Sequence, residues 1–197
     1  MGKHKKDPYK CENFGSYSKV HVTNGSFLIS NEDLEFVLND RWNLRIRKNK
    51  IVAVQRGLMI KGFSYSIGLH REICKRIGLN IDGFEIDHID CDPANNIREN
   101  LRVVTSSQNK MNKDKTFLNK SGYKGVHFNK RANKFTAQIA INRKQIHLGL
   151  FLTAEEAAAA YDRASIIYHK EYGRLNFPKV IYTKPWGHSQ IVPATNQ

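Results

Sequence analysis

The sequence predicts an α+β fold in two parts, and three observations support this prediction. The N-terminal part mixes short strand-like and helical runs, and it ends in a strand–loop–strand–helix pattern over residues 85–112. The C-terminal part has three runs of period two followed by one long helical run. A polar stretch without periodicity separates them. We therefore expect a small α+β segment leading into a strand–strand–helix (ββα) module, then a three-stranded antiparallel sheet packed on one α-helix.

These patterns predict five segments along the chain. The polar N-terminus is expected to be flexible, and so is the tail, which has no periodicity. Between them we expect two domains joined by a basic linker that could follow a phosphate backbone. The predicted bounds are 1–16 for the flexible N-terminus, 17–112 for the first domain, 113–120 for the linker, 121–178 for the second domain and 179–197 for the tail.

The first domain is expected to begin with a hairpin over residues 19–30, because Asn24 and Gly25 favour a tight turn between two apolar runs. A short helix should follow to about Asn39, with Asn31 as its N-cap. The remaining elements expected before the ββα pattern are an alternating strand-like run at 42–46, strands at 51–55 and 58–67 and a helix at 69–77.

The second domain is predicted to be a meander of three strands. Residues 135–141 alternate strictly between apolar and polar, and Ile146, Leu148 and Leu150 suggest a third alternating strand. The helix that follows should start at a capping box formed by Thr153 and Glu156. It should close at Gly173, after which residues 175–177 are expected to return as an edge strand.

The charge of the chain points to a polyanionic partner. Lys and Arg total 32 against 18 Asp and Glu, which gives a net charge of +14. Each cation placed on a phosphate releases condensed counterions, so nucleic acid is the expected partner. The alternative, charge that serves solubility alone, would be met at least as well by acidic residues.

Neither a disulfide framework nor a zinc knuckle is supported. Cys11, Cys74 and Cys91 are far apart and form no C-x-x-C pair, as expected for reduced thiols. No apolar run approaches the roughly 20 residues that span a bilayer. We therefore expect a soluble protein with no membrane partner and no small-molecule cofactor, located in the cytoplasm of a bacterium or of a phage-infected host cell.

The chemistry is expected where two short strands meet a helix. Asp87 and His88 lie on the first strand, and Asn109 lies in the early turns of a helix that begins near residue 105. His88 suits a general base because the ordinary pKa of histidine, about 6.5, is close to working pH. The carboxylate of Asp87 and the amide carbonyl of Asn109 are hard oxygen ligands suited to Mg²⁺. Neighbours on a regular strand point to opposite faces, so a distorted strand end is expected at Asp87 and His88.

This stretch resembles the HNH endonuclease family, also called ββα-metal, and particularly its phage and intron homing-type branch. The resemblance implies a divalent metal, most simply Mg²⁺, held by Asp87 and Asn109, with His88 as the general base. Asn100 matches the middle Asn of the motif, which completes the catalytic set by bracing the loop through backbone hydrogen bonds. The residues that carry the resemblance are 85–90, 95–96, 98–102 and 105–109.

His70 has two interpretations before this motif. It could contact DNA, or it could be a histidine at a helix start that makes a structural hydrogen bond. The sequence favours the structural interpretation.

The second domain resembles the APETALA2/ERF DNA-binding domain, which is known from plant transcription factors and also occurs fused to phage HNH nucleases. The resemblance covers nearly all of residues 121–178. It implies that the sheet enters the major groove of double-stranded DNA. The polar residues expected on its solvated face, and so against DNA, are Lys124, His127, Asn129, Lys134, Gln138, Arg143 and Lys144.

The leading hypothesis is therefore a metal-dependent, homing-type DNA endonuclease. A DNA-binding transcription regulator with an inactive nuclease remnant is the first alternative, and a basic structural or RNA-binding protein is the second. One nuclease centre per chain is compatible with nicking or with a dimer, so the oligomeric state stays open.

Overall fold

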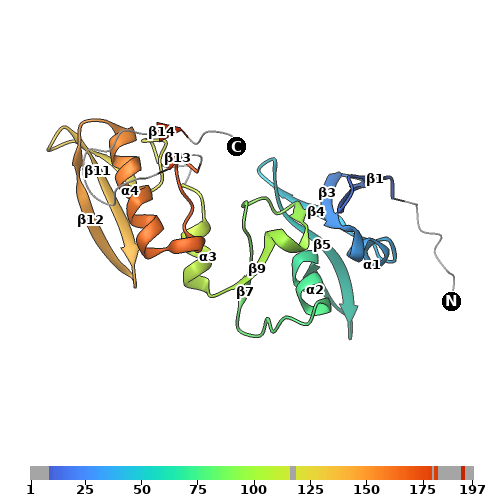
Figure 1. Cartoon of the computed structure of the whole chain (residues 1–197). Coiled ribbons are helices and arrows are strands. Elements are labelled where there is room, and N and C mark those ends of the chain that lie inside the picture. The colour runs from blue at the N-terminus through green and yellow to red at the C-terminus, as the bar shows by residue number, and fades with distance from the viewer. Residues whose placement is uncertain (1–8, 116–118, 179, 182–191, 194–197) are drawn as a thin grey trace, which may run out of the picture. The chain divides into compact units, whose positions relative to one another are not determined.

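The chain consists of two compact units, residues 1–106 and 107–197, each with its own core. The computed structural model describes residues 9–115, 119–178, 180–181 and 192–193 (Figure 1). It is a mixed α+β structure with several small sheets, as the sequence predicted.

The first unit contains a four-stranded sheet in the order β1-β2-β3-β8. The predicted hairpin is confirmed. A further strand, β1, precedes it within the segment 1–16 that was expected to be flexible, and residues 1–8 lie outside the described part. The fourth strand, β8, comes from the loop that precedes residues 101–104 and pairs in parallel with β3. The strands are β1 (Cys11–Asn13), β2 (Tyr17–Val22), β3 (Gly25–Ser30) and β8 (Asn95–Asn96).

The short helix after this hairpin is confirmed, but its predicted N-cap is wrong. A 3-10 turn, η1 (Asn31–Asp33), leads into α1 (Leu34–Leu38) without a side-chain cap. The Oδ1 atom of Asn31 instead accepts a hydrogen bond from Ser18 Oγ at 2.6 Å, and its Nδ2 donates to the carbonyl of Gly15 at 2.6 Å. The Asn31 side chain, which the local sequence predicted to cap the helix, therefore bonds residues 13 and 16 positions earlier in the chain.

A second sheet of the first unit has three antiparallel strands in the order β4-β5-β6 and leads into α2. The expected break between strands 51–55 and 58–67 is absent. The chain instead continues as one strand, β5, to Ile60, and the rest of the second predicted strand forms its antiparallel partner, β6. The chain turns later, at Gly62, whose φ of +83° suits a tight turn. The elements are β4 (Asn43–Arg47), β5 (Lys50–Ile60), β6 (Phe63–Gly68) and α2 (Leu69–Arg76).

One apolar core holds the first unit together. Strand residues from both sheets meet the buried face of α2, and the helix predicted at 69–77 is confirmed because Leu69 and Ile73 lie on that face. The fully buried members of the core include Val20, Phe27, Ile29, Val37, Val54, Leu69 and Ile73.

The second unit contains the predicted meander of three strands packed on one helix. The alanines of α4 let the helix approach the sheet closely, and Ala157 and Ala158 lie against Val126 and Ala137. Gly125 is required at this contact, since a Cβ there would lie 2.0 Å from the ring of Tyr161. The elements are β10 (Val126–Asn129), β11 (Lys134–Ile141), β12 (Lys144–Phe151) and α4 (Ala154–Tyr168); α3 (Ser106–Asn112) spans the boundary between the units.

The third strand of the meander does not alternate strictly. A bulge interrupts the pairing of β11 with β12 between Ala137 and Gln138. Ile146 therefore pairs with the buried Ile139, whereas Leu150 pairs with Thr136 on the opposite face. The predicted single apolar face through residues 146, 148 and 150 is wrong, because the extra residue changes the phase of the strand.

The predicted capping box of α4 is confirmed. The backbone N–H of Glu156 donates to Thr153 Oγ1 at 3.1 Å, and the N–H of Thr153 donates to the Glu156 carboxylate at 3.2 Å. The helix ends at Tyr168, before a 3-10 turn, η3 (Lys170–Tyr172), and Gly173.

The edge strand predicted at 175–177 is absent, because the buried carboxylate of Asp162 binds this segment instead. It accepts hydrogen bonds from the backbone N–H groups of Asn176 and Phe177, both at 2.8 Å. Within the predicted flexible tail, β13 (Val180–Ile181) pairs with β14 (Val192–Pro193). The other tail positions lie outside the described residues.

Among the described residues, no helix combines the length and apolar character needed to cross a bilayer.

Candidate functional site

The residues expected to carry the chemistry lie on a two-stranded antiparallel pair in the first unit. β7 (Glu85–His88) pairs with β9 (Leu101–Val104), which places Asp87 opposite Arg102 and His88 opposite Leu101. The pairing is regular at both positions, so the strand distortion expected there is not observed. Asp87 and His88 consequently leave the strand on opposite faces.

The carboxylate of Asp87 is buried and faces a guanidinium. Arg102 donates to Asp87 Oδ2 from Nε at 2.9 Å and from Nη2 at 2.8 Å. Cross-strand neighbours of opposite charge hold each other in place, and a buried carboxylate needs such a partner to stay ionised. Arg102 therefore pairs with the carboxylate of Asp87 and fixes it in the strand.

The imidazole of His88 is held by a buried amide. Its Nε2 lies 3.4 Å from Asn96 Oδ1, while the Nδ2 of Asn96 donates to the carbonyl of Pro93 at 3.1 Å. Since Oδ1 only accepts, this contact is a hydrogen bond in the tautomer that carries the proton on Nε2, and Nδ1 is the basic nitrogen of that tautomer. Burial lowers the pKa of His88 below its ordinary value of 6.5 and outweighs the Asn96 hydrogen bond and nearby aspartates, which raise it. The imidazole is therefore neutral at physiological pH.

A second histidine packs against the first. The rings of His70 and His88 meet edge to face, with centroids 5.3 Å apart. His70 Nδ1 is buried without a hydrogen-bond partner in the described part of the chain, so a structural hydrogen bond at this atom is not found. Burial, with His88 and Arg71 adding to it, lowers the pKa of His70 to about 4. A Cβ at Gly68 would lie 2.7 Å from this ring, so glycine makes room for it.

The loop between the two strands is braced by Asn100. Its Nδ2 donates to the carbonyl of Asn95 at 2.8 Å and to Asp90 Oδ1 at 2.9 Å, and its Oδ1 accepts from the Asp90 N–H at 3.1 Å. Burial would raise the pKa of Asp90, but hydrogen bonds from Asp92, Asn95 and Asn100 lower it overall. The loop thus holds a charged carboxylate in a closed set of local contacts.

A buried ion pair attaches this loop to the N-terminal sheet. Arg98, in the 3-10 turn η2 (Arg98–Asn100), donates to the two oxygens of Asp33 at 2.6 and 2.9 Å. Asp33 is fully buried at the start of α1. Together with the β3–β8 pairing, this contact fixes the loop that carries Asn96 and Asn100.

The donor set fits a hard divalent cation bound through few protein ligands. No group of three or more His, Cys, Asp and Glu side chains suited to a metal occurs among the described residues. Mg²⁺ commonly uses one or two protein oxygens and takes its other ligands from water and phosphate. The carboxylate of Asp87 suits that mode. Asn109, the second expected ligand, belongs to the second unit, so its pairing with Asp87 stays a prediction.

The sheet of the second unit presents a polar face opposite its core. Pairing places His127 beside Thr136, Asn129 beside Lys134, and Gln138 beside His147. Four of the expected DNA-contacting residues, His127, Asn129, Lys134 and Gln138, therefore share one face. His147 and Gln145 lie on this face too, as alternation with Ile146 implies, whereas the β-bulge adds Leu150 to it.

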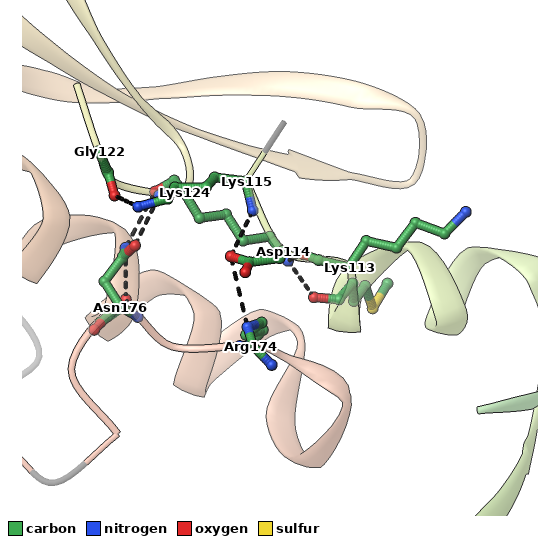
Figure 2. A network of polar contacts seen from close by, with 9 residues as sticks. Lys113, Asp114, Lys115, Gly122, Lys124, Arg174 and Asn176 are labelled. Carbon is green, nitrogen blue, oxygen red and sulfur yellow. Dashed lines mark hydrogen bonds and ion pairs between the residues drawn. The ribbon is translucent and has the colours of Figure 1, made fainter. Parts of the chain in front are cut away.

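The other three expected contact residues are placed differently. Arg143 lies in the β11–β12 turn with a φ of 65°, and Lys144 pairs with Ile141 on the side of the core. The ammonium of Lys124 is bound to the carbonyl of Met111 and to that of Lys113 (the Lys113 contact is labelled in Figure 2). Lys124 thus fastens the end of α3 to the second unit.

Residues 113–115, within the expected linker, are bound to the same unit. Lys115 donates to the carbonyl of Gly122, and Asp114 forms an ion pair with Arg174 at 3.7 Å (Figure 2). The described part of this segment is therefore anchored by local charges.

Comparison with known proteins supports both parts of this description. A family model described as HNH endonuclease matches residues 68–111, which include His70 and the whole strand–loop–strand segment. An uncharacterized HNH endonuclease of Acanthamoeba polyphaga mimivirus is 32% identical over 132 residues, covering 64% of this chain and 66% of that protein.

Two plant proteins of Arabidopsis thaliana are also similar. An ethylene-responsive transcription factor is 40% identical over 65 residues, 32% of this chain and 35% of that protein. An ethylene-responsive transcription factor-like protein is 32% identical over 90 residues, 45% of this chain and 39% of its own length. The chain thus spans well under half of these plant relatives. No solved structure gives a significant match. The chain is therefore a member of the HNH endonuclease family that also carries an ERF-like DNA-binding domain.

Proposed function

We propose that this chain is a metal-dependent endonuclease of the homing type that hydrolyses phosphodiester bonds in double-stranded DNA. The observation that carries the proposal is the fixed, neutral imidazole of His88, next in the chain to the Arg102-bound carboxylate of Asp87, within the residues matched by the HNH family model. Such a pair supplies a base for water and a ligand for a cation. We place this activity in the cytoplasm of a bacterium or phage-infected cell.

In the proposed reaction, His88 Nδ1 accepts a proton from the attacking water. Asn96 directs this nitrogen by holding the Nε2 proton, and the low pKa keeps the base ready at neutral pH. Asn100 keeps the loop in place through its three hydrogen bonds, and so acts without touching the phosphate. Asp87 and Asn109 would hold Mg²⁺, which neutralises charge on the phosphate and on the leaving oxygen.

The ERF-like domain would anchor the nuclease on its target. Gln138 and Asn129, on the polar sheet face, suit adenine, while Lys134 and Arg143 suit guanine or phosphate. Tethering a second binding module raises its effective concentration, so neither module needs high affinity alone. His147 and Gln145 join this proposed DNA-contacting face because they pair with Gln138 and Ala140.

One observation favours a second candidate function, a DNA-binding regulator with an inactive nuclease. The carboxylate of Asp87 already has a cationic partner in Arg102, which would compete with a metal ion for the same oxygens. A regulator of this kind would bind duplex DNA through the sheet and leave it uncut.

Metal dependence separates the two functions. We expect purified protein to cut random-sequence duplex DNA in Mg²⁺, and we expect this cleavage to stop when EDTA is added. Sequencing of the 3′ and 5′ ends maps the cleavage positions. Intact DNA in both Mg²⁺ and Mn²⁺, with binding retained, would support the regulator.

The pH dependence of cleavage should follow the base. A general base must be neutral, and the pKa of His88 is lowered from 6.5, so the single-turnover rate should stay level down to about pH 6.5 and fall only at lower pH. Rates measured from pH 5 to 8 at constant Mg²⁺ test this. A rate that already falls between pH 8 and 7 would assign the base to another group.

A further inference from the structure

The three-stranded sheet β4-β5-β6 has a polar face that the proposed catalytic site does not use. We call this face the outer sheet face, and assign residues to it from the pairing. Leu44 pairs with Val54, and both are buried in the core. Their neighbours on each strand therefore point the other way. The outer sheet face comprises Asn43, Arg45, Arg47, Lys50, Ala53, Gln55, Gly57, Ser64, Ser66 and Gly68, together with one exposed apolar side chain, Met59.

A β-bulge keeps the cations of this face together. Arg45 pairs with Ala53, and the register shifts before Ile46 pairs with Ile51, which packs on the core. Arg47 then pairs directly with Lys50 on the outer side. The turn between them is tight, since Lys48 and Asn49 both have positive φ, at 48° and 59°. The end of the hairpin thus presents its cations in a defined arrangement.

The charge of this sheet is unfavourable without a partner. Residues 41–71 contain eight Lys and Arg and no Asp or Glu. Like charges directly opposite each other on antiparallel strands destabilise a sheet, as Arg47 and Lys50 do here. Arg45, Arg47 and Lys50 are exposed and form no ion pair with any described residue, whereas the inward Arg56 is paired with Asp40 and Glu72. An anionic ligand would remove this repulsion.

We infer that the outer sheet face is a second DNA-contacting surface, which binds B-form duplex through its phosphates and major-groove edges. The inference rests on the proposed function in taking duplex DNA as the partner. A β-ribbon fits a major groove about 12 Å wide. Ala53 and Gly57 have no large side chain, so the backbone at the centre of the face can approach a ligand closely. The polar groups around this centre come from Asn43, Gln55, Ser64 and Ser66. The nuclease unit would then hold DNA itself, apart from the ERF-like sheet.

The test compares two double variants of the full chain with the same loss of charge. Arg47→Gln with Lys50→Gln removes the opposed cations, and Lys10→Gln with Lys75→Gln removes two exposed lysines outside the sheet. Duplex binding is measured in EDTA across salt concentrations, and cleavage at saturating DNA in Mg²⁺. Thermal unfolding checks the fold, and the first variant should be as stable as wild type or more so, because repulsion is relieved.

We expect the Arg47/Lys50 variant to bind at least about tenfold more weakly at 0.1 M salt, with its salt slope reduced by about 1.8, since each lost phosphate contact removes about 0.9. Its saturated cleavage rate and the binding of the Lys10/Lys75 variant should be unchanged. Equal weakening of both variants, or none in the first, would overturn the inference; so would tighter binding to duplex RNA, whose major groove excludes a sheet. Normal DNA binding without any cleavage would overturn the proposed function and leave this surface supported.

Discussion

Replacing His88 with alanine is expected to slow DNA cleavage by about 10²–10⁴-fold, the usual contribution of a general base, and to leave duplex binding unchanged. The imidazole is fixed by Asn96 and His70 and is neutral at physiological pH, so its loss removes the proton acceptor without removing a charge that binds phosphate. Single-turnover cleavage and equilibrium binding, measured on the same duplex, give the two quantities separately.

The matched control is His21→Ala, which removes an imidazole from β2 of the same unit, where its Nε2 lies 3.0 Å from Glu12. This variant should cleave at the wild-type rate. Full cleavage by His88→Ala would contradict the assigned role. An equal loss of binding and cleavage would instead mean that the substitution had damaged the fold.

Replacing Arg98 with methionine is expected to lower the free energy of unfolding of the first unit by about 3–5 kcal/mol, because it leaves the buried carboxylate of Asp33 without its bidentate partner. Methionine fills much of the volume of the arginine stem, so the loss reports the charge. Urea denaturation followed by the fluorescence of the buried Trp42, in a Trp186→Phe background so that Trp42 is the one tryptophan present, measures this quantity.

Arg76→Met supplies the control for this ion pair. Arg76 approaches the same carboxylate at 3.9 Å, but its side chain is 49% exposed, so its removal should lower stability by about 1 kcal/mol or less. A similar decrease in the free energy of unfolding in both variants would show that the bidentate contact of Arg98 stabilises the unit no more than the longer contact of Arg76. If Arg98→Met also slows cleavage, the loop with Asn96 and Asn100 is coupled to this anchor.

Local patterns predicted most of the secondary structure. The period-two runs at 126–129 and 134–141 are strands, and the Thr153–Glu156 capping box marks the start of α4. In each case the residues that define the element are near neighbours, so propensity and capping act within a few positions of the chain. Likewise, the helix at 69–76 follows from one apolar face.

The errors arise where distant residues determine the structure. Asn31 bonds Ser18 in place of capping α1, and Asp162 captures Asn176 and Phe177 in place of an edge strand. The bulge in the β11–β12 pair changes which side chains face out, and nothing in the alternation of β12 marks it. These contacts depend on tertiary approach, which overrides local preference.

The candidate site shows the same limit. The motif marks Asp87, His88 and Asn100, but their partners Arg102, Asn96 and His70 follow only from the pairing of β7 with β9 and the packing of α2. His70 is separated from His88 by 17 intervening residues, so no short spacing could reveal that their rings touch. The sequence suggests the chemistry, and the tertiary structure gives the protonation state of the base.

The proposed nuclease activity requires the carboxylate of Asp87 to bind a divalent cation despite its pairing with Arg102. Titration of the full chain with Mn²⁺, followed by water-proton relaxation, tests this directly in wild type, Asp87→Asn and the exposed, charge-matched Glu99→Gln. We predict one site that Asp87→Asn weakens at least about tenfold and that Glu99→Gln leaves unchanged. The same Mn²⁺ affinity in wild type and Asp87→Asn would contradict the account.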